Sequence, residues 1–295
     1  MSPRRHHRPG ALALLRLGAH LPWWLWRPVS VLGTVVLATA PGGFTPVRQW
    51  RLNYERVQGR PAGWTTTYRA FIGWMENTMI SLQLAGWSEA RIRRRIVMED
   101  SDAWARLEAA HAEGGVVAAL PHMGSWDLVG AYACLEGLPV TSVAEGLPDG
   151  QFEYFRDLRA RLGFRIYDVR DRAVFTRLRD DLDEGRVVCL VADRDFSRRG
   201  VPVTWHLPAG DARITMPPGP GLLAQQTARP LFGAVTWFGR AGRLHVLVRG
   251  PMDVARGADG LEAGVQELAD FFCAQISERT VNWHMMQRFF KGVVA

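Results

Sequence analysis

Cysteine is scarce in this chain, and its spacing argues against two kinds of structural site. The three cysteines, Cys134, Cys189 and Cys273, lie far apart in 295 residues and form no Cys-x-x-Cys pair. Neither a disulfide framework nor a structural zinc site is therefore expected. A reducing cytosolic compartment fits this usage.

The chain also lacks a Gly-x-Ser-x-Gly turn, the motif that presents a nucleophilic serine in many hydrolases. Its cysteines lie in apolar runs, where burial keeps a thiol protonated and unreactive. No protein nucleophile is evident. We therefore expect any group transfer to rely on a general base rather than on a covalent intermediate.

No apolar run is long enough to cross a bilayer, which takes about 20 residues. The best candidate, residues 29–40, is shorter, and extending it backwards takes in Arg27 and Pro28. The first 60 residues hold nine arginines and one glutamate, a balance of +8 that exceeds the +7 of the whole chain. Interleaved with "LPWWLW", this charge predicts a monotopic contact with an anionic membrane surface. A single buried helix is the alternative.

The rhythm of apolar residues predicts the fold. The first 95 residues read as helices, and from residue 99 short apolar runs such as "GVVAAL" and "RVVCLVAD" alternate with amphipathic segments. This alternation predicts an α/β fold whose largely parallel sheet is covered by helices. With no repeat or low-complexity linker, we expect membrane-contacting helices at residues 1–45 and a single α/β domain at 46–295.

The loop "PHMGSWDLVGAY" places His122 five residues ahead of Asp127, between an apparent strand and a helix. Open α/β sheets put ligand sites at this end of a strand. A histidine oriented by a carboxylate can act as a general base towards a substrate hydroxyl. The alternative is structural: Asp127 is then a helix-start carboxylate and His122 a loop residue.

Other candidate residues follow the same logic. Asp193, Arg194 and Asp195 come directly after the strand "VVCLVA", so they are expected at the same sheet edge as His122. His284, within "NWHMMQ", is a candidate for substrate contact, and a packed histidine with one hydrogen bond is its alternative.

Several blocks of the chain resemble a known family. "PHMGSWDLVGAY" is similar to the His-x-x-x-x-Asp block of bacterial lipid acyltransferases, which include the late acyltransferases of lipid A biosynthesis. It looks most like the actinobacterial phosphatidylinositol mannoside acyltransferases. The resemblance continues in "RQWRLNYERV", "SVAEGLPDGQFEYFRDLRARLGFRIY", "VVCLVADRDFSRRGVPV", "ITMPPGPGLLAQQTARPLF" and "NWHMMQRFF".

This resemblance implies a membrane-associated enzyme on the cytoplasmic face of the plasma membrane. It implies transfer of a fatty acyl chain, expected to be palmitoyl, from acyl-CoA to a mannose hydroxyl of a phosphatidylinositol mannoside. Acyl-CoA is then a co-substrate, with no cofactor and no metal. His122 would be the general base and Asp127 its orienting partner.

The resemblance also implies roles for four further residues. "FRDLRARLG" matches a Phe-x-x-x-Arg-x-x-x-Gly pattern at Arg159, so Arg159 would face substrate phosphate or a developing oxyanion. Glu145 would hold sugar hydroxyls or this arginine. A surface salt bridge is the alternative for both. The family has an acid near Asp193 and Asp195, and the sequence leaves open which one serves the site.

Rival functions remain at this stage. The acceptor is either a phosphatidylinositol mannoside or another glycolipid or lysophospholipid. A non-catalytic protein that binds anionic membranes is the alternative from a different class, but it leaves the His-Asp loop unexplained. Nucleic acid is not an expected partner, because the basic residues lie among apolar segments and no nucleic-acid module is recognisable.

Overall fold

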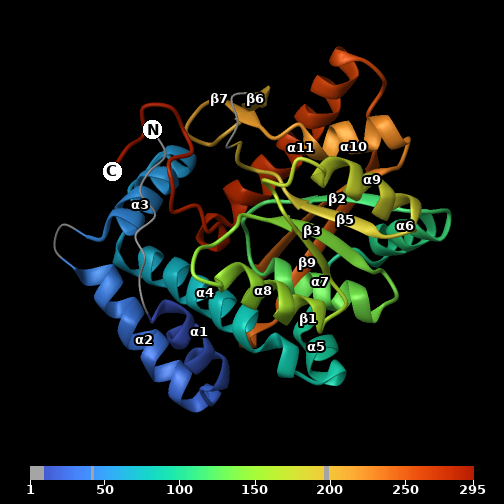
Figure 1. The fold of residues 1–295 in the computed structure, drawn as a ribbon. Helices are drawn as coiled ribbons and strands as arrows, with labels where there is room; N and C mark the ends of the chain where they lie inside the picture. Colours follow the sequence, from blue (N-terminus) through green and yellow to red (C-terminus); the bar gives the residue numbers. More distant parts are fainter. Residues whose placement is uncertain (1–9, 41–42, 196–198) are drawn as a thin grey trace.

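The computed structural model describes residues 10–40, 43–195 and 199–295 (Figure 1). Arg4, Arg5 and Arg8 of the predicted basic segment lie outside the described residues. Within those residues, no helix is both long and apolar enough to cross a membrane.

A seven-stranded sheet forms the centre of the molecule, in the order β1-β9-β8-β2-β5-β3-β4. Its strands are β1 (Ile96–Met98), β2 (Val116–Leu120), β3 (Val140–Ala144), β4 (Arg165–Asp168), β5 (Val187–Val191), β8 (Leu231–Phe238) and β9 (Leu244–Met252). All neighbouring pairs are parallel except β8 and β9, which form an antiparallel hairpin around η2 (Arg240–Gly242). The predicted α/β fold with a largely parallel sheet is confirmed.

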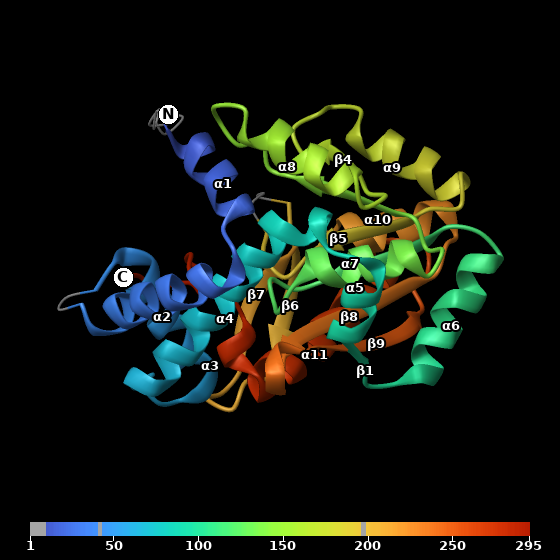
Figure 2. The ribbon, with the colours of Figure 1, turned by 90° about the horizontal axis from the view of Figure 1, so that it is seen from below.

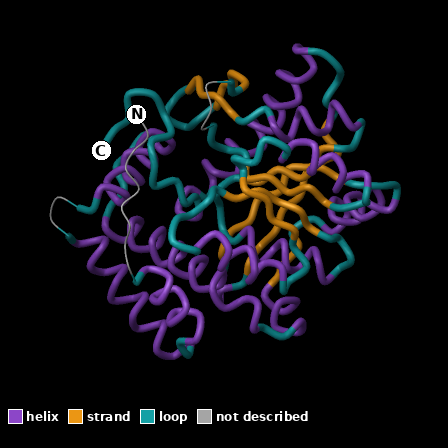
Figure 3. The backbone as a smooth tube through the Cα atoms, viewed as in Figure 1, coloured by secondary structure: helices purple, strands orange, loops and turns teal. Residues whose placement is uncertain are grey.

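Helices cover both faces of this sheet (Figure 3). They are α5 (Glu89–Arg95), α6 (Ser101–Ala112), α7 (Trp126–Leu135), α8 (Gln151–Ala160), α9 (Val174–Asp183), α10 (Gly219–Thr227) and α11 (Ala258–Glu278). Along β2, Val117 and Ala119 face a core formed with α9, α10 and α11, while Val116, Ala118 and Leu120 face a core formed with α5, α6 and α7. Because both faces are buried, the strand reads as a continuous apolar run.

A separate two-stranded hairpin lies outside the main sheet (Figure 3). Strands β6 (Val201–Trp205) and β7 (Ala212–Met216) pair antiparallel. Gln266 of α11 bonds both the amide and the carbonyl of Thr204, at 2.9 and 2.8 Å, which fixes the hairpin on that helix. The hairpin thereby extends the core on the α11 side of the sheet.

Four amino-terminal helices lie to one side of the sheet in both ribbon views (Figures 1 and 2). They are α1 (Ala11–His20), α2 (Trp23–Thr39), α3 (Thr45–Gln58) and α4 (Trp64–Gln83), and the turn η1 (Leu84–Gly86) follows α4. α2 runs antiparallel to α4, because Arg51 links Ala38 to Thr67 at one end and Gln83 bonds Leu21 at the other. The functional division at residue 45 stays a prediction.

The end of the chain returns to the centre of the molecule. After η3 (Thr280–Asn282), residues 283–293, here called the C-terminal strap, run between α3 and the loop that follows β2. On the α3 side, Trp50 Nε1 donates to the carbonyl of Trp283 at 2.9 Å, and Asn53 Nδ2 donates to the carbonyls of Met285 and Gln287. On the other side, Met123 and Trp283 form an antiparallel bridge.

Candidate active site

Strand pairing brings His122 next to Asp193. β2 and β5 are parallel with Leu120 opposite Val191, so His122 and Asp193 each lie two residues beyond a paired position. His122 Nδ1 lies 2.6 Å from Asp193 Oδ1. The prediction that these two residues lie at the same sheet edge is therefore confirmed, and their side chains are in direct contact.

Asp193 is fully buried but well supplied with donors. Its Oδ2 accepts hydrogen bonds from the backbone amide of His122 at 3.1 Å and from the indole Nε1 of Trp283 at 2.8 Å. Burial alone raises the pKa of a carboxyl, but the charge and hydrogen bonds of His122 and Trp283 outweigh it and lower the pKa of Asp193. The carboxylate is therefore ionised.

The same contact sets the protonation of His122. An ionised carboxylate only accepts, so Nδ1 carries the proton and Nε2 is left as the basic nitrogen. Burial lowers the pKa of His122, but the Asp193 carboxylate more than offsets burial and raises it. The side chain is 31% exposed, and within the described residues Nε2 has no hydrogen-bond partner.

The loop between β2 and α7 is shaped by Gly124 and Thr236. Gly124 has a φ of 63°, and a Cβ there would collide with the Thr236 backbone. The Thr236 hydroxyl donates to the Met123 carbonyl at 2.8 Å and accepts from the Ser125 amide at 3.1 Å. β8 thus holds the loop that carries His122.

Asp127 does not orient His122 in the structure, contrary to the predicted geometry. Its Oδ1 accepts from Arg159 Nε at 2.7 Å, and its Oδ2 accepts from Arg159 Nη2 at 3.1 Å and from the Ser81 hydroxyl at 2.6 Å. The reason is local: Asp127 lies in the first turn of α7, which faces α4 and α8, while strand pairing supplies His122 with Asp193.

Arg159 is consequently a buried, oriented cation. Its side chain is mostly buried, and Asp127 binds two of its three nitrogens in a bidentate pair. Burial lowers the pKa of Arg159, but Asp127 raises it further than burial lowers it. Within the described residues Nη1 has no partner, so one edge of the guanidinium is available to an anion.

The remaining predicted acids separate in space. Glu145 directly follows β3, is exposed, and lies close enough to Arg194 to raise its pKa, although burial lowers that pKa overall. The Asp195 carboxylate lies against Gly200, just before β6. Of the two acids that the sequence left open, Asp193 is therefore the one that contacts His122.

His284 lies beside His122 on the C-terminal strap. Its amide donates to the His122 carbonyl at 2.7 Å, and its Nε2 lies 3.0 Å from the Gly124 carbonyl. Burial, together with the neighbouring His122, lowers the pKa of His284 to about 4. The ring is therefore neutral, and its Nε2–H donates to Gly124.

This lowered pKa predicts a pH-dependent stability. An unfolded histidine has a pKa of about 6.5, so between pH 6.5 and 4 the unfolded chain binds a proton that folded His284 does not. Stability is therefore complete above this window and falls within it, by about 3 kcal/mol. Urea unfolding at pH 7 and 4.5 measures this loss, and His284→Gln, which keeps a donor for Gly124, is expected to lose less. An identical pH slope in the two proteins would contradict the assignment.

Within residues 10–40, 43–195 and 199–295, no group of three or more His, Cys, Asp or Glu side chains could hold a metal ion.

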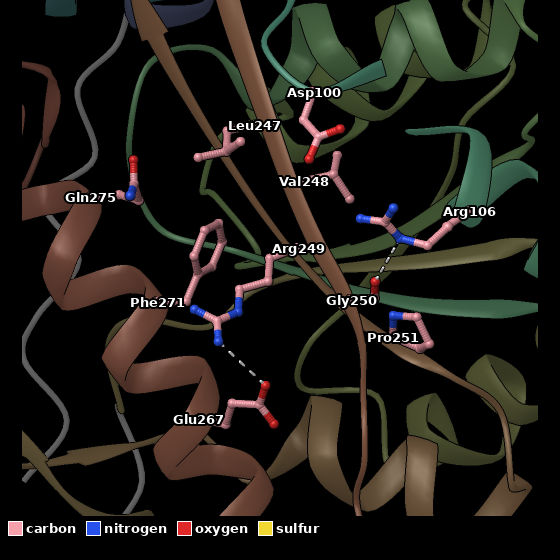
Figure 4. A pocket seen from close by; sticks show the side chains of 10 residues that line it. All are labelled: Asp100, Arg106, Leu247, Val248, Arg249, Gly250, Pro251, Glu267, Phe271 and Gln275. Atoms are coloured by element: carbon pink, nitrogen blue, oxygen red, sulfur yellow. Dashed lines mark hydrogen bonds and ion pairs between the residues drawn. The ribbon is translucent and has the colours of Figure 1, made fainter. Parts of the chain in front are cut away.

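A cavity of about 400 Å³ is lined by residues that include Arg106, Arg249 and Pro251 (Figure 4). Met252 pairs with Leu231 at the start of β8, so this end of the cavity lies at the edge of the sheet opposite His122.

Comparison with known sequences decides the family. Residues 66–292 match the family described as bacterial lipid A biosynthesis acyltransferase, which is most of the chain. The chain belongs to this acyltransferase family. The matched region of the acyltransferase includes His122, Asp193 and the strap residues Trp283 and His284.

Two similar proteins are named phosphatidylinositol mannoside acyltransferase. The protein from Mycolicibacterium smegmatis is 33% identical over 250 residues, which cover 81% of this chain and 78% of that protein. The protein from Mycobacterium tuberculosis is 38% identical over 186 residues, 61% of this chain and 56% of that protein. The resemblance inferred from the sequence blocks is confirmed.

Sequence reasoning missed two residues of the acyltransferase site. Ser81 lies in α4 with nothing in its neighbourhood to mark it, and it contacts Asp127 only through the fold. Trp283 precedes His284 in a block that the sequence had already singled out, and its position beside a candidate histidine was the available signal.

Proposed function

We propose that this acyltransferase moves a fatty acyl chain, such as palmitoyl, from acyl-CoA to a mannose hydroxyl of a phosphatidylinositol mannoside. The observation that carries the proposal is the His122–Asp193 pair at the carboxyl edge of a largely parallel sheet, where no side chain or backbone group of the described residues bonds the basic Nε2 of His122. The names of the two similar proteins support the acceptor. Acyl-CoA acts as a co-substrate, and the proposal needs no cofactor or metal.

The chemistry requires a base and two bound substrates. His122 Nε2 removes the proton of the acceptor hydroxyl as its oxygen attacks the thioester carbonyl carbon. The tetrahedral intermediate then collapses, the carbon–sulfur bond breaks, and the imidazolium returns the proton to the departing thiolate. Asp193 fixes the tautomer and stabilises the imidazolium while it exists.

Cationic groups around the pair supply binding and electrostatic stabilisation. Ser81 donates to Asp127, and Asp127 in turn holds Arg159 in a bidentate pair, so that the Nη1 edge, which has no partner within the described residues, binds a substrate phosphate or the oxyanion of the intermediate. Glu145 and Arg194 extend from the ends of β3 and β5 at the same edge, where they can contact sugar hydroxyls and phosphate. Asp195 and His284 complete the predicted substrate contacts.

Mass spectrometry of reaction products tests this function. Purified protein is incubated with palmitoyl-CoA and a panel that contains phosphatidylinositol mannosides, other glycolipids and lysophospholipids. We expect one acyl chain to be added to the mannose of a phosphatidylinositol mannoside. Preferential acylation of another glycolipid or a lysophospholipid would show that the proposed acceptor is wrong. No acylation of any acceptor in the panel would overturn the proposed function.

Kinetics are expected to be sequential, because direct attack by the acceptor requires both substrates to be bound together. Initial rates measured against both substrate concentrations should give intersecting double-reciprocal lines. Intact-protein mass spectrometry after incubation with palmitoyl-CoA alone should find no added acyl group. Ping-pong kinetics, or an acyl group trapped on a serine or cysteine, would instead indicate a covalent intermediate.

We propose a peripheral membrane contact on the cytoplasmic face, and α2 supports the contact itself, because its buried side carries small residues and its solvent-facing side large apolar ones. Its buried face carries Ser30, Thr34 and Ala38 at intervals of four residues. Its solvent-facing side carries large apolar side chains, which include Trp24 and Leu32 at 63% and 67% exposure. Small residues between helices and apolar residues outside are typical of helices in contact with lipid. We propose that α2 lies in the membrane interface with this side towards the acyl chains.

Replacing two exposed apolar residues of α2 tests this contact. Leu32→Gln together with Val36→Gln is expected to weaken binding to anionic vesicles roughly 10- to 100-fold, because about 2 kcal/mol of apolar burial is lost without a change in charge. Vesicle sedimentation measures the effect. The control is Val169→Gln, an equally exposed apolar residue away from α2, which should bind like the unmodified protein. Unchanged binding of the double variant would refute the contact.

A further inference from the structure

Trp283 contacts the His122–Asp193 pair through the carboxylate oxygen that does not face the His122 ring. It is fully buried, and its indole Nε1 donates to Asp193 Oδ2 at 2.8 Å. The other carboxylate oxygen, Oδ1, faces His122 Nδ1 at 2.6 Å. One rigid carboxylate thus connects the indole to the imidazole.

Trp283 is itself held from several directions. Its carbonyl accepts from Trp50 Nε1 at 2.9 Å, and its backbone bridges to Met123 in the loop that carries His122. Its ring packs edge-on against Phe289 at 4.8 Å and tilted against Trp205 at 5.9 Å. The indole N–H therefore has a fixed position from which to orient the carboxylate.

The strap around Trp283 is anchored on both sides as well. Asn53, fully buried on α3, donates to the carbonyls of Met285 and Gln287 at 2.9 and 2.8 Å. On the sheet side, Asn282 accepts at Oδ1 from the Phe238 amide and at its carbonyl from the Gly124 amide. These bonds connect the amino-terminal helices to the loop after β2 through the strap.

A carboxylate that orients a base has to be oriented itself. Without the indole, the one donor left to Asp193 Oδ2 among the described residues would be the His122 amide, which lies on the same residue as the ring that Asp193 must align. We propose that Trp283 is a positioning residue that fixes Asp193 and, through it, the His122 ring. This role rests on the proposed function above, because it presumes that His122 is the base.

A matched pair of tryptophan variants tests the role. Trp283→Phe removes the N–H and keeps an aromatic ring, so kcat should fall about tenfold while KM for both substrates stays within about twofold. Trp205→Phe is the control. Trp205 is equally buried in the same aromatic cluster, but within the described residues its indole N–H has no acceptor. Equal kcat for the two variants would overturn the proposal.

A double-mutant cycle separates positioning from general stability. If Trp283 acts only through Asp193, then Asp193→Asn combined with Trp283→Phe should be no slower than Asp193→Asn alone. If Trp283 merely supports the fold, the losses in kcat of the two single variants should multiply in the double variant. Multiplied losses would therefore assign Trp283 a structural role.

Proton NMR provides a readout that needs no substrate. The His122 Nδ1–H, identified by its loss in Asp193→Asn, should give a downfield resonance that moves or broadens in Trp283→Phe and stays in place in Trp205→Phe. In ¹⁵N-labelled protein the Trp283 indole resonance should shift in Asp193→Asn, which tests the contact even if Trp283→Phe is unstable. Unchanged resonances would refute the positioning role. If the resonances respond as expected but the unmodified protein transfers no acyl chain, the contact between Trp283 and Asp193 stands and the proposed function is refuted.

Discussion

His122→Ala is expected to lower the rate of acyl transfer by about 10²–10⁴-fold, because it removes the general base proposed to accept the hydroxyl proton. Nε2 is the basic nitrogen of a ring whose other nitrogen is bound to Asp193. The change also empties a partly exposed position, so folding should be retained. Acyl-transfer assays alongside thermal melts measure both effects.

The chain offers a matched control for this variant. His206 also lies beside a carboxylate, with Nδ1 3.0 Å from Asp211 Oδ1, but both side chains are about two-thirds exposed at the edge of the β6–β7 hairpin. His206→Ala should keep full activity. A folded His122→Ala protein as active as His206→Ala would refute general-base catalysis at His122.

Asp193→Asn is expected to have the second large effect, a loss of about 10²–10⁴-fold in kcat. An asparagine cannot accept from the His122 ring and from the Trp283 indole in the same way as two carboxylate oxygens, and a wrong histidine tautomer turns the basic nitrogen away from substrate. Steady-state kinetics at saturating substrate measure kcat directly.

Asp127→Asn is the informative contrast. Asp127 neutralises the buried Arg159, so its loss should destabilise the fold by about 3 kcal/mol and raise KM through a misplaced guanidinium. Asp193→Asn is therefore expected to lower kcat, whereas Asp127→Asn is expected to lower the stability of the fold and raise KM. A kcat loss confined to Asp127→Asn, with Asp193→Asn fully active, would restore the pairing that the sequence suggested.

Much of the fold was predictable because local patterns determine it. The run "GVVAAL" is apolar at every position because β2 is buried on both faces, and that property marks a central parallel strand. The β8–β9 hairpin was also predictable, because its two apolar runs, "PLFGAVTWF" and "RLHVLV", are joined by a short turn that contains glycine. The β6–β7 hairpin was not, because Val201–Trp205 and Ala212–Met216 are short and their partner is the distant helix α11.

Most residues of the candidate site were predictable, with Ser81 and Trp283 as the exceptions, but the pairings between them were not. Sequence proximity favoured Asp127 as the partner of His122, yet a helix that starts between the two residues turns the carboxylate towards Ser81 and Arg159. Asp193 is 71 residues from His122, and only the register of β2 with β5 brings the pair together. Strand adjacency of this kind cannot be read from either strand alone.

The C-terminal strap also makes the active site a late product of protein synthesis. Trp283 leaves the ribosome 90 residues after Asp193 and 233 residues after Trp50, the two side chains that it joins. Most of the sheet can assemble on the nascent chain before then. A nascent chain made only as far as α11 therefore carries both His122 and Asp193 and still lacks the tryptophan that lies between Asp193 and α3. Synthesis of residues 283–293 is thus the step that brings the proposed positioning residue to the His122–Asp193 pair.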